Sequence, residues 1–355
     1  MSIPVPDSSP VTVVHADRAA ALPLRVSYER ASASEVLTDP HVLAVLGFGY
    51  ATDRNGAISM ASSVQDDPRF LRVGLQSPGD NGVIEVWRGN SPVTTGRDGR
   101  LRWSSNGEYL WFAIEIDERD LSTMTRAHSL QTDIEMSAES AYREIVAFHG
   151  GRPNLHPLRF WNYFDAINAG DGDAERYRHF CTGRASGLGD VLGSTYPAAT
   201  AIGRQDGVRV LQIYGISAIR PGMAIENPRQ VSAWRYPRAY GPTSPSFARA
   251  MRSDAKQLFI SGTAAVVGHA SRHDNDLDAQ IAETLANLDS VLNASGSGKQ
   301  LGTLSLLKAY VRFPADAARV ESAVRERFPD LRDLLILGGD ICRRELLVEI
   351  DGVHG

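Results

Sequence analysis

From residue 109 onward, hydrophobic and polar positions follow one another in a way that predicts the same succession of elements twice. In the first copy, runs rich in aromatic and β-branched residues predict strands at 109–116 (YLWFAIEI), from 158 (LRFWNYF), from 196 (YPAATAIG) and from 208 (VRVLQIYG). The segments AESAYREIVAFHG and DAERYRHFCTGR are predicted helices. The first copy is therefore expected to run strand, helix, strand, helix, strand, strand.

The second copy begins with a predicted strand at 257–264 (QLFISGTA). A long amphipathic helix, DAQIAETLANLDSVL, follows, with apolar residues at Ile281, Leu285, Leu288 and Leu292. The remaining predicted elements are strand SLLKAYVRF, helix ADAARVESAVRERF, strand LLILGGDI and strand LLVEIDGV. Because both copies have the same order, we expect an α+β fold in which an internal repeat forms two related domains.

An N-terminal arm, additional strands and a long connection complete the predicted organisation. Residues 1–22 are rich in Pro, Ser and Ala without periodicity, and we expect a flexible N-terminal arm. Segments such as HVLAVLGFGYA, RFLRVGLQ and GVIEVWRG are predicted strands that extend the first domain. Residues 219–253 form a long connection rich in Pro, Arg and Tyr, and connections of this length are uncommon unless they are functional. The predicted domains are 23–218 and 254–355, with an active-site connection at 219–253.

Composition narrows the possible functions. The 355 residues are 43% hydrophobic and 22% charged, with a net charge of -5 and interspersed signs, so neither a nucleic-acid nor a membrane partner is indicated. No apolar stretch reaches the ~20 residues that span a bilayer. Cys181 and Cys342 are far apart and lack C-x-x-C spacing, which fits a reducing compartment. We expect a cytoplasmic protein.

Motifs for cofactors and metals fail on inspection. ASGSGKQ has Gln300 where a phosphate loop requires Ser or Thr, and Asn293 where its first glycine belongs. GFGYATDRNG lacks the third glycine of a dinucleotide fingerprint. His269 and His273 are four residues apart, but no helical HExxH pattern accompanies them. We expect neither a metal ion nor another cofactor.

Several segments resemble known families. The second copy resembles the RidA/YjgF family of small α+β domains in FISGTA, ETLANLDSVL, KAYVRF and the terminal VEI. The chain from about Leu24 is more similar to the chorismatases, in which two RidA-like halves are joined. This resemblance is carried by RFWNYFDAINAGDGDAERYRHFCTGRA, NPRQVSAWRYPRAYGPTSPSFARA, FISGTAAVVGHASRH and GGDICRRELLVEI. It implies chorismate as a small-molecule substrate and no cofactor, and we expect a monomer.

Glu349 is the candidate group for proton transfer. In LLVEID, apolar residues alternate with Leu347, Glu349 and Asp351, so a strand would put both carboxylates on one face. By pattern alone, such a face is a solvated strand edge. Chorismatases carry their catalytic glutamate in this VEI segment, so the resemblance implies that Glu349 is catalytic. A glutamic acid can protonate the methylene carbon of an enol ether if burial raises its pKa toward neutrality.

A second group of residues is expected to bind the substrate. Tyr177 and Arg184 are seven residues apart in a predicted helix, which places both on one side, either as packing and surface residues or as partners of one ligand. Chorismatases hold a substrate carboxylate with a tyrosine and an arginine at this spacing, so the resemblance implies that role here. A dianionic substrate needs at least one more arginine. The further candidates are Arg238, Tyr240 and Arg343, with loop or surface positions as the alternative.

Cys342 and Gly262 bear on the choice of product. A lone cysteine at the end of an apolar strand is commonly a small buried hydrophobe, and a glycine in a strand commonly marks a bulge or a close backbone approach. Chorismatases that make 3-hydroxybenzoate resemble this chain in having cysteine and glycine at these places, whereas members that release the dihydrodiol tend to have alanine. The resemblance therefore implies a catalytic contribution from Cys342 and a position at the substrate for Gly262.

Taken together, the resemblance implies cleavage of the enolpyruvyl ether of chorismate to pyruvate and 3-hydroxybenzoate, with 4-hydroxybenzoate as a side product. One alternative is hydrolysis to pyruvate and a 3,4-dihydroxycyclohexadiene carboxylate. A second is a RidA-like enamine or imine deaminase, which would lack the Tyr177 and Arg184 pair. A third is a non-catalytic aromatic-acid binding protein, which a turnover assay would distinguish.

Overall fold

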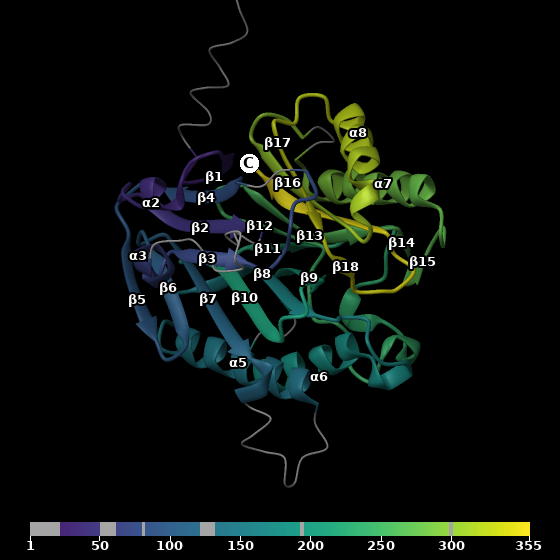
Figure 1. Ribbon diagram of the computed structural model, residues 1–355, viewed down its shortest axis with the longest axis horizontal. Coiled ribbons are helices and arrows are strands. Elements are labelled where there is room, and N and C mark those ends of the chain that lie inside the picture. Colours follow the sequence, from purple (N-terminus) through teal and green to yellow (C-terminus); the bar gives the residue numbers. More distant parts are fainter. Residues whose placement is uncertain (1–21, 50–61, 80–81, 121–131, 192–194, 298–300) are drawn as a thin grey trace, which may run out of the picture.

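Three of the sheets in the described part of the chain share one order of strands. The structure, a computed structural model, describes residues 22–49, 62–79, 82–120, 132–191, 195–297 and 301–355, so the expected arm at 1–22 lies outside the described residues except for its last residue. Figure 1 shows the sheets with their helices on the outside of the molecule. The predicted α+β class is confirmed.

The first copy, here called the first repeat, forms most of a seven-stranded sheet with the order β18-β9-β8-β10-β7-β6-β5. Its elements are β7 (Tyr109–Asp117), α5 (Asp133–Gly150), β8 (His156–Asp165), α6 (Arg176–Leu188), β9 (Ala198–Arg204) and β10 (Val210–Ala218). Two preceding strands, β5 (Thr94–Asp98) and β6 (Leu101–Ser105), extend the sheet beyond β7. β8 and β9 are parallel, whereas β10 is antiparallel to β7 and β8. The predicted succession of elements is confirmed.

The second repeat forms a six-stranded sheet with the order β11-β12-β13-β19-β16-β17. Its elements are β13 (Leu258–Ala264), α7 (Leu277–Ser295), β16 (Ser305–Val311), α8 (Ala317–Arg327), β17 (Asp333–Gly338) and β19 (Val348–His354). The pairing matches the first repeat, since β16 and β17 are parallel and β19 is antiparallel to β13 and β16. This succession is also confirmed.

The predicted strand LLILGGDI divides at its two glycines. After β17 ends, β18 (Asp340–Ile341) leaves its own sheet and pairs with β9 of the first repeat. A side chain at Gly339 would begin 2.5 Å from Ile202, and one at Gly203 would begin 2.8 Å from the Asp340 Cβ. Glycine at both places therefore permits the contact that joins the two repeats here.

The strands before residue 90 form a sheet of their own, instead of extending the first domain as expected. Strand, helix, strand, helix, strand, strand recurs as β1 (Leu24–Glu29), α2 (Ala33–Val36), β2 (Val42–Phe48), α3 (Ser62–Asp66), β3 (Phe70–Val73) and β4 (Ile84–Gly89). The order β1-β4-β2-β3, with β2 and β3 parallel, is that of the two repeats. We call this the N-terminal unit. Its helices have four and five residues, too few to show a period in the sequence.

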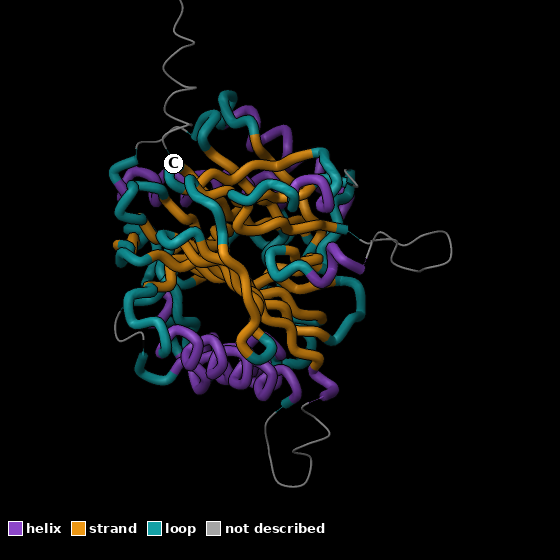
Figure 2. The backbone as a smooth tube through the Cα atoms, turned by 90° about the vertical axis from the view of Figure 1, so that its left-hand side faces the viewer, coloured by secondary structure: helices purple, strands orange, loops and turns teal. Residues whose placement is uncertain are grey.

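Strands of the two repeats are buried on both faces. In β7, Tyr109 and Trp111 enter a central core shared by the three sheets, whereas the alternate residues pack against α5 and α6. In β19, Ile350 packs on the side of α7 and α8, so Glu349 and Asp351 face the centre. Figure 2 shows helices lying outside the strands. Burial on both faces explains the continuous apolar runs in the sequence.

The connection at 219–253 is anchored at both ends in the second sheet. β11 (Met223–Ile225) pairs with β12 (Ala250–Arg252), which pairs with β13. Short 3-10 helices, η2 (Ala233–Arg235) and η3 (Arg238–Tyr240), lie between them. The remaining short elements are η1 (Gly172–Ala174), β14 (Val266–Val267), β15 (Ala270–Ser271) and η4 (Pro314–Asp316). No helix in the described ranges is long and apolar enough to cross a membrane.

Candidate active site

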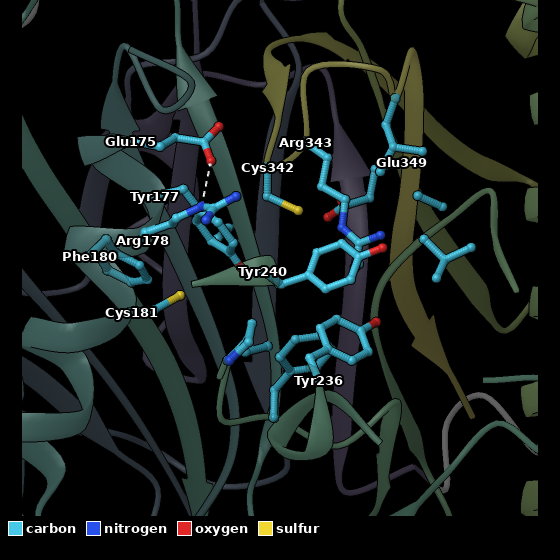
Figure 3. Close-up of a pocket in the computed structure, with 18 of the residues that line it drawn as sticks. Glu175, Tyr177, Arg178, Phe180, Cys181, Tyr236, Tyr240, Cys342, Arg343 and Glu349 are labelled. Atoms are coloured by element: carbon cyan, nitrogen blue, oxygen red, sulfur yellow. Dashed lines mark hydrogen bonds and ion pairs between the residues drawn. The ribbon is translucent and has the colours of Figure 1, made fainter. Parts of the chain in front are cut away.

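A cavity of about 300 Å³ lies where the two repeats meet. Its lining comes from α6 and β9 of the first repeat, from the connection, and from β13, β19 and the residues between β18 and β19. Most of the residues expected from the sequence line it, namely Tyr177, Arg184, Tyr240, Gly262, Cys342, Arg343 and Glu349. In Figure 3, Glu349 and Tyr177 come from opposite sides of the view and Cys342 lies between them.

β19 places Glu349 in the cavity wall. The strand lies between β13 and β16, where Glu349 is opposite Ala264 and Tyr310. Glu349 is 4% exposed, so the alternative of a solvated strand edge is wrong. Burial, and then the charge of Asp351, raises the pKa of Glu349 from 4.5 to about 8, although nearby arginines oppose this rise. Glu349 is therefore protonated at neutral pH and can act as an acid.

Gly262 makes room for this carboxyl group. The pairing of β13 with β19 shifts between Ile260 and Thr263, so the bulge that a glycine commonly marks is present. A Cβ added at position 262 would lie 1.9 Å from Glu349 Oε1 and 3.2 Å from the Thr200 hydroxyl oxygen. Carbon and oxygen atoms that are not bonded to each other do not approach as closely as 1.9 Å, so a larger residue would force the Glu349 carboxyl to move.

α6 brings Tyr177 and Arg184 to the cavity together, two turns apart on one side of the helix. Gly187 lets α6 pack closely on α5, since a Cβ there would lie 2.5 Å from the Glu139 carbonyl oxygen. Arg184 is buried, and its guanidinium lies 5.1 Å from the centre of the Tyr142 ring. Among the described residues, its Nε and Nη2 have no hydrogen-bond partner. A buried cation with free donors is suited to binding a carboxylate.

The connection supplies an aromatic part of the wall. Tyr236 and Tyr240 pack with ring centres 5.4 Å apart, and the Arg343 guanidinium lies 4.2 Å from the centre of the Tyr240 ring. Arg343 Nη1 donates to the His269 carbonyl at 2.8 Å and to the Ser271 hydroxyl at 3.0 Å. These bonds hold Arg343 at the cavity, and the binding roles of Arg343 and Tyr240 stay predictions.

Arg249, directly before β12, was not foreseen from the sequence. It lines the cavity, is buried, and donates through Nη2 to the Tyr236 hydroxyl at 2.7 Å and the Val231 carbonyl at 2.9 Å. Its Nε has no partner in the described part of the chain. The available signal was an arginine between Ala248 and Ala250, in a stretch that otherwise reads as buried strand.

Arg238 was expected at the cavity and lies outside its lining. Its side chain is 64% exposed and forms an ion pair with Asp173, close to the start of α6. Its neighbours Ala239 and Tyr240 line the cavity instead, because successive side chains of the short helix η3 point in different directions. We therefore replace Arg238 with Arg249 among the candidate substrate-binding residues.

The two cysteines both line the cavity. Burial raises the pKa of the Cys342 thiol well above its usual range, and the charge of Glu349 adds to this effect. Burial also raises the pKa of Cys181 to about 12. Both thiols are therefore neutral near pH 7 and poorly nucleophilic. Cys342 is suited to shaping the wall beside the substrate and not to attacking it.

Comparison with known proteins agrees with this picture. A family model described as "Chorismatase FkbO/Hyg5-like, N-terminal" matches residues 85–217. The chain is 32% identical over 302 residues to a 3-hydroxybenzoate synthase of Streptomyces hygroscopicus, covering 80% of this chain and 84% of that protein. It is 33% identical over 346 residues to a chorismatase of Streptomyces rapamycinicus, covering 92% and 96%. A chorismatase crystal structure is similar with a TM-score of 0.76 at 28% identity, covering 94% of this chain and 98% of that one. The chain belongs to the chorismatase family.

Proposed function

We propose that this protein cleaves the enolpyruvyl ether of chorismate, releasing pyruvate and 3-hydroxybenzoate. The observation that carries the proposal is a buried, protonated Glu349 in a cavity that also contains Arg184 and Arg249, two buried arginines with unpaired donors. An enol ether needs an acid to start its cleavage, and a substrate with two carboxylates needs two cations. The relatives described above carry the names 3-hydroxybenzoate synthase and chorismatase.

In the proposed reaction, Glu349 gives its proton to the methylene carbon of the side chain, and positive charge develops at the ether-bearing carbon. The ring 4-hydroxyl then displaces the side chain from the ring, and the hydroxyl proton returns to Glu349 as pyruvate leaves. The resulting arene oxide is an isomer of 3-hydroxybenzoate and rearranges to it as a ring proton is lost and a hydroxyl is formed. No water is consumed, whereas the hydrolytic alternative consumes one water and releases the dihydrodiol.

Purified protein should release pyruvate from chorismate in the presence of a chelator and without added nucleotide. A lactate-dehydrogenase-coupled assay measures this release, and chromatography of the same reaction identifies the aromatic product. Release no faster than the uncatalysed reaction would contradict the proposal and leave the aromatic-acid binding protein as the alternative. Turnover of an imine with none of chorismate would instead favour the deaminase.

Arg184→Ala should weaken substrate binding and raise KM about 10- to 100-fold, because one substrate carboxylate would be left without its buried partner. Arg238→Ala is the matched control, since that arginine is exposed and lies outside the cavity lining. Steady-state kinetics of both variants test the assignment. An unchanged KM in the Arg184 variant would remove this residue from the binding site.

We also propose that the protein acts as a monomer in the cytoplasm without a nucleic-acid partner. Three sheets already enclose a common core within one chain, which supports a monomer. Light scattering of the purified protein tests this, and a mass of two or more chains would contradict it.

A further inference from the structure

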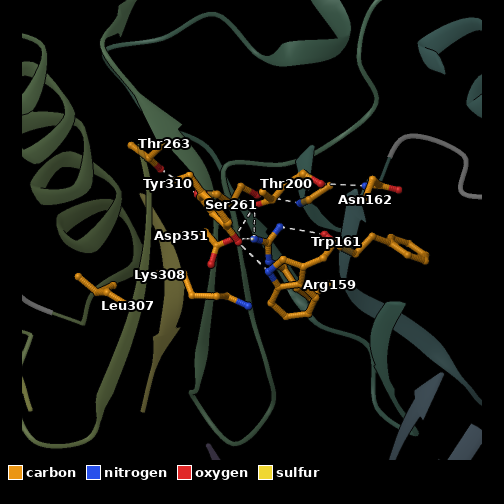
Figure 4. A network of polar contacts seen from close by, with 12 residues as sticks. Arg159, Trp161, Asn162, Thr200, Ser261, Thr263, Leu307, Lys308, Tyr310 and Asp351 are labelled. Atoms are coloured by element: carbon orange, nitrogen blue, oxygen red, sulfur yellow. Dashed lines mark hydrogen bonds and ion pairs between the residues drawn. The ribbon is translucent and has the colours of Figure 1, made fainter. Parts of the chain in front are cut away.

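A second carboxyl group lies two residues from Glu349 on the same face of β19. Asp351 is fully buried, and four donors converge on its Oδ2. They are Arg159 Nη2 at 3.1 Å, Trp161 Nε1 at 3.0 Å, and the hydroxyls of Thr200 and Tyr310 at 2.9 Å each. Figure 4 shows this network, which joins β8 and β9 of the first repeat to β16 and β19 of the second.

Glu349 has the opposite environment. Among the described residues, no hydrogen bond reaches its carboxyl group, and the group lies in the wall of the cavity. Residues two apart on a strand are about 7 Å apart, so the two carboxyls are close enough to influence each other when both are removed from water. A carboxylate with several donors stays ionised, whereas one without donors in a buried site stays protonated.

We propose that Asp351 is a positioning residue that keeps the acid proton on Glu349, because four donors fix a negative charge on Asp351 beside the carboxyl group that faces the cavity. This rests on the proposed function in one respect, namely that Glu349 is the acid. The assignment of the proton to Glu349 itself follows from the surroundings of the two carboxyl groups.

The reverse arrangement, with the proton on Asp351, lacks an acceptor. Oδ2 already receives four donors, and Oδ1 is buried without any hydrogen-bond partner among the described residues. A proton on either oxygen would therefore be a buried donor with nothing to receive it, which is costly. Arg159 is always charged and lies against Oδ2, so it further favours ionised Asp351.

The charge of Asp351 matters because other groups around Glu349 lower the pKa of its carboxyl group. The groups that influence Glu349 from the packed elements are Asp351, Arg159, Arg249, Arg343, Tyr177 and Cys342. The three arginines favour an ionised Glu349, whereas burial and Asp351 favour the protonated form. The other titratable groups near Asp351 are Lys308, Tyr28, Tyr163, Tyr214 and Tyr310, and Glu85 pairs with Lys308. Without Asp351, the balance at Glu349 would move toward the carboxylate.

The direct test is a ¹³C NMR titration of the full chain labelled at glutamate carboxyl carbons, with the Glu349 signal assigned by its absence from Glu349→Gln. In wild type, Glu349 should titrate near pH 8. In Asp351→Asn, the midpoint of the Glu349 titration should fall by at least one pH unit. At a pH above both midpoints, the protonated fraction of Glu349 is then about tenfold smaller than in wild type. An unchanged midpoint in this variant overturns the proposal, as does a protonated Asp351 at neutral pH in an aspartate-labelled sample.

Asp351→Asn leaves the buried Arg159 without its anion and can fail to fold. The double variant Asp351→Asn/Arg159→Gln removes both charges, and Glu349 should still titrate below wild type because Asp351 acts on it more strongly than Arg159 does. Tyr163→Phe is the matched control, since the Tyr163 hydroxyl lies 2.9 Å from that of Tyr310 and, among the described residues, forms no hydrogen bond with Asp351. This control should titrate like wild type.

Kinetics separate this role from a merely structural one. In Asp351→Asn, the alkaline limb of kcat/KM for pyruvate release should move to lower pH with the Glu349 titration, whereas structural damage lowers activity at every pH. The NMR titration needs no substrate. A protein that titrates as expected but does not cleave chorismate would therefore contradict the proposed function and leave the assignment of the proton intact.

Discussion

Glu349→Gln should release pyruvate from chorismate at least ~100-fold more slowly than wild type, the usual range for a positioned general acid. Glutamine has nearly the same volume and fits the space beside Gly262, so the cavity is preserved. It cannot give a proton to the methylene carbon. The loss should appear in kcat and kcat/KM alike, because the missing interaction exists in the transition state and not in substrate binding. Activity within a few-fold of wild type would show that Glu349 is not the acid.

Thermal melting provides the control that the variant is folded. The pKa of Glu349 is 4.5 in an unfolded chain and is raised to about 8 by burial in the fold. The unfolded chain therefore ionises first, and wild type loses stability as pH rises from 4.5 to about 8. Glutamine cannot ionise. The difference in melting temperature, variant minus wild type, should therefore become more positive as the pH rises through this range. A difference that does not change with pH would contradict the burial of a protonated Glu349.

The wild-type enzyme should make mainly 3-hydroxybenzoate, and Gly262→Ala combined with Cys342→Ala should shift the product toward the dihydrodiol. The structure adds a steric cause that the sequence did not suggest. A methyl group at position 262 would begin 1.9 Å from Glu349 Oε1, so the alanine acts on the acid itself in addition to the wall beside the ring. A tenfold change in the ratio of products needs only ~1.4 kcal/mol.

Chromatography of wild-type and variant reactions measures this ratio. The single variants separate the two positions: Gly262→Ala should carry most of the change, because Cys342→Ala removes a sulfur from the wall without displacing Glu349. Gly302→Ala is a control in the same repeat, since the nearest atom to an added Cβ there is 4.0 Å away. A wild-type reaction that gives only dihydrodiol would show that the assigned product is wrong even if chorismate is cleaved.

Regular periodicity explains what could be predicted from the sequence. Strands buried on both faces leave long apolar runs, and α7 shows its buried side at every third or fourth residue, so the order of elements in both repeats was readable. Alternation in β19 put Glu349 and Asp351 on one face, and helical spacing put Tyr177 and Arg184 on one side. Alternation in a strand and spacing in a helix depend only on neighbouring residues, so both can be read without knowing the tertiary structure.

The remaining features depend on contacts that no local pattern records. Arg238 and Arg249 lie in the same Arg-rich connection. The folded path of this connection exposes Arg238 to solvent and buries Arg249 at the cavity, and no local pattern distinguishes the two. The transfer of β18 to the other sheet depends on close approach at Gly203 and Gly339. The N-terminal unit was missed because short helices lack a recognisable period.

The threefold recurrence of one strand order within a single chain has a consequence for how this enzyme can change. In a ring of three identical subunits, every substitution appears at all three contacts. Here the contacts can diverge separately: Gln212 bonds to Gly74 and Arg72 where the N-terminal unit meets the first repeat, and Lys308 pairs with Glu85 at 3.0 Å where that unit meets the second. Covalent fusion thus lets each contact change on its own. The contact between the two repeats holds the buried acid Glu349 beside the β18–β9 pairing, while the two contacts of the N-terminal unit keep other residues.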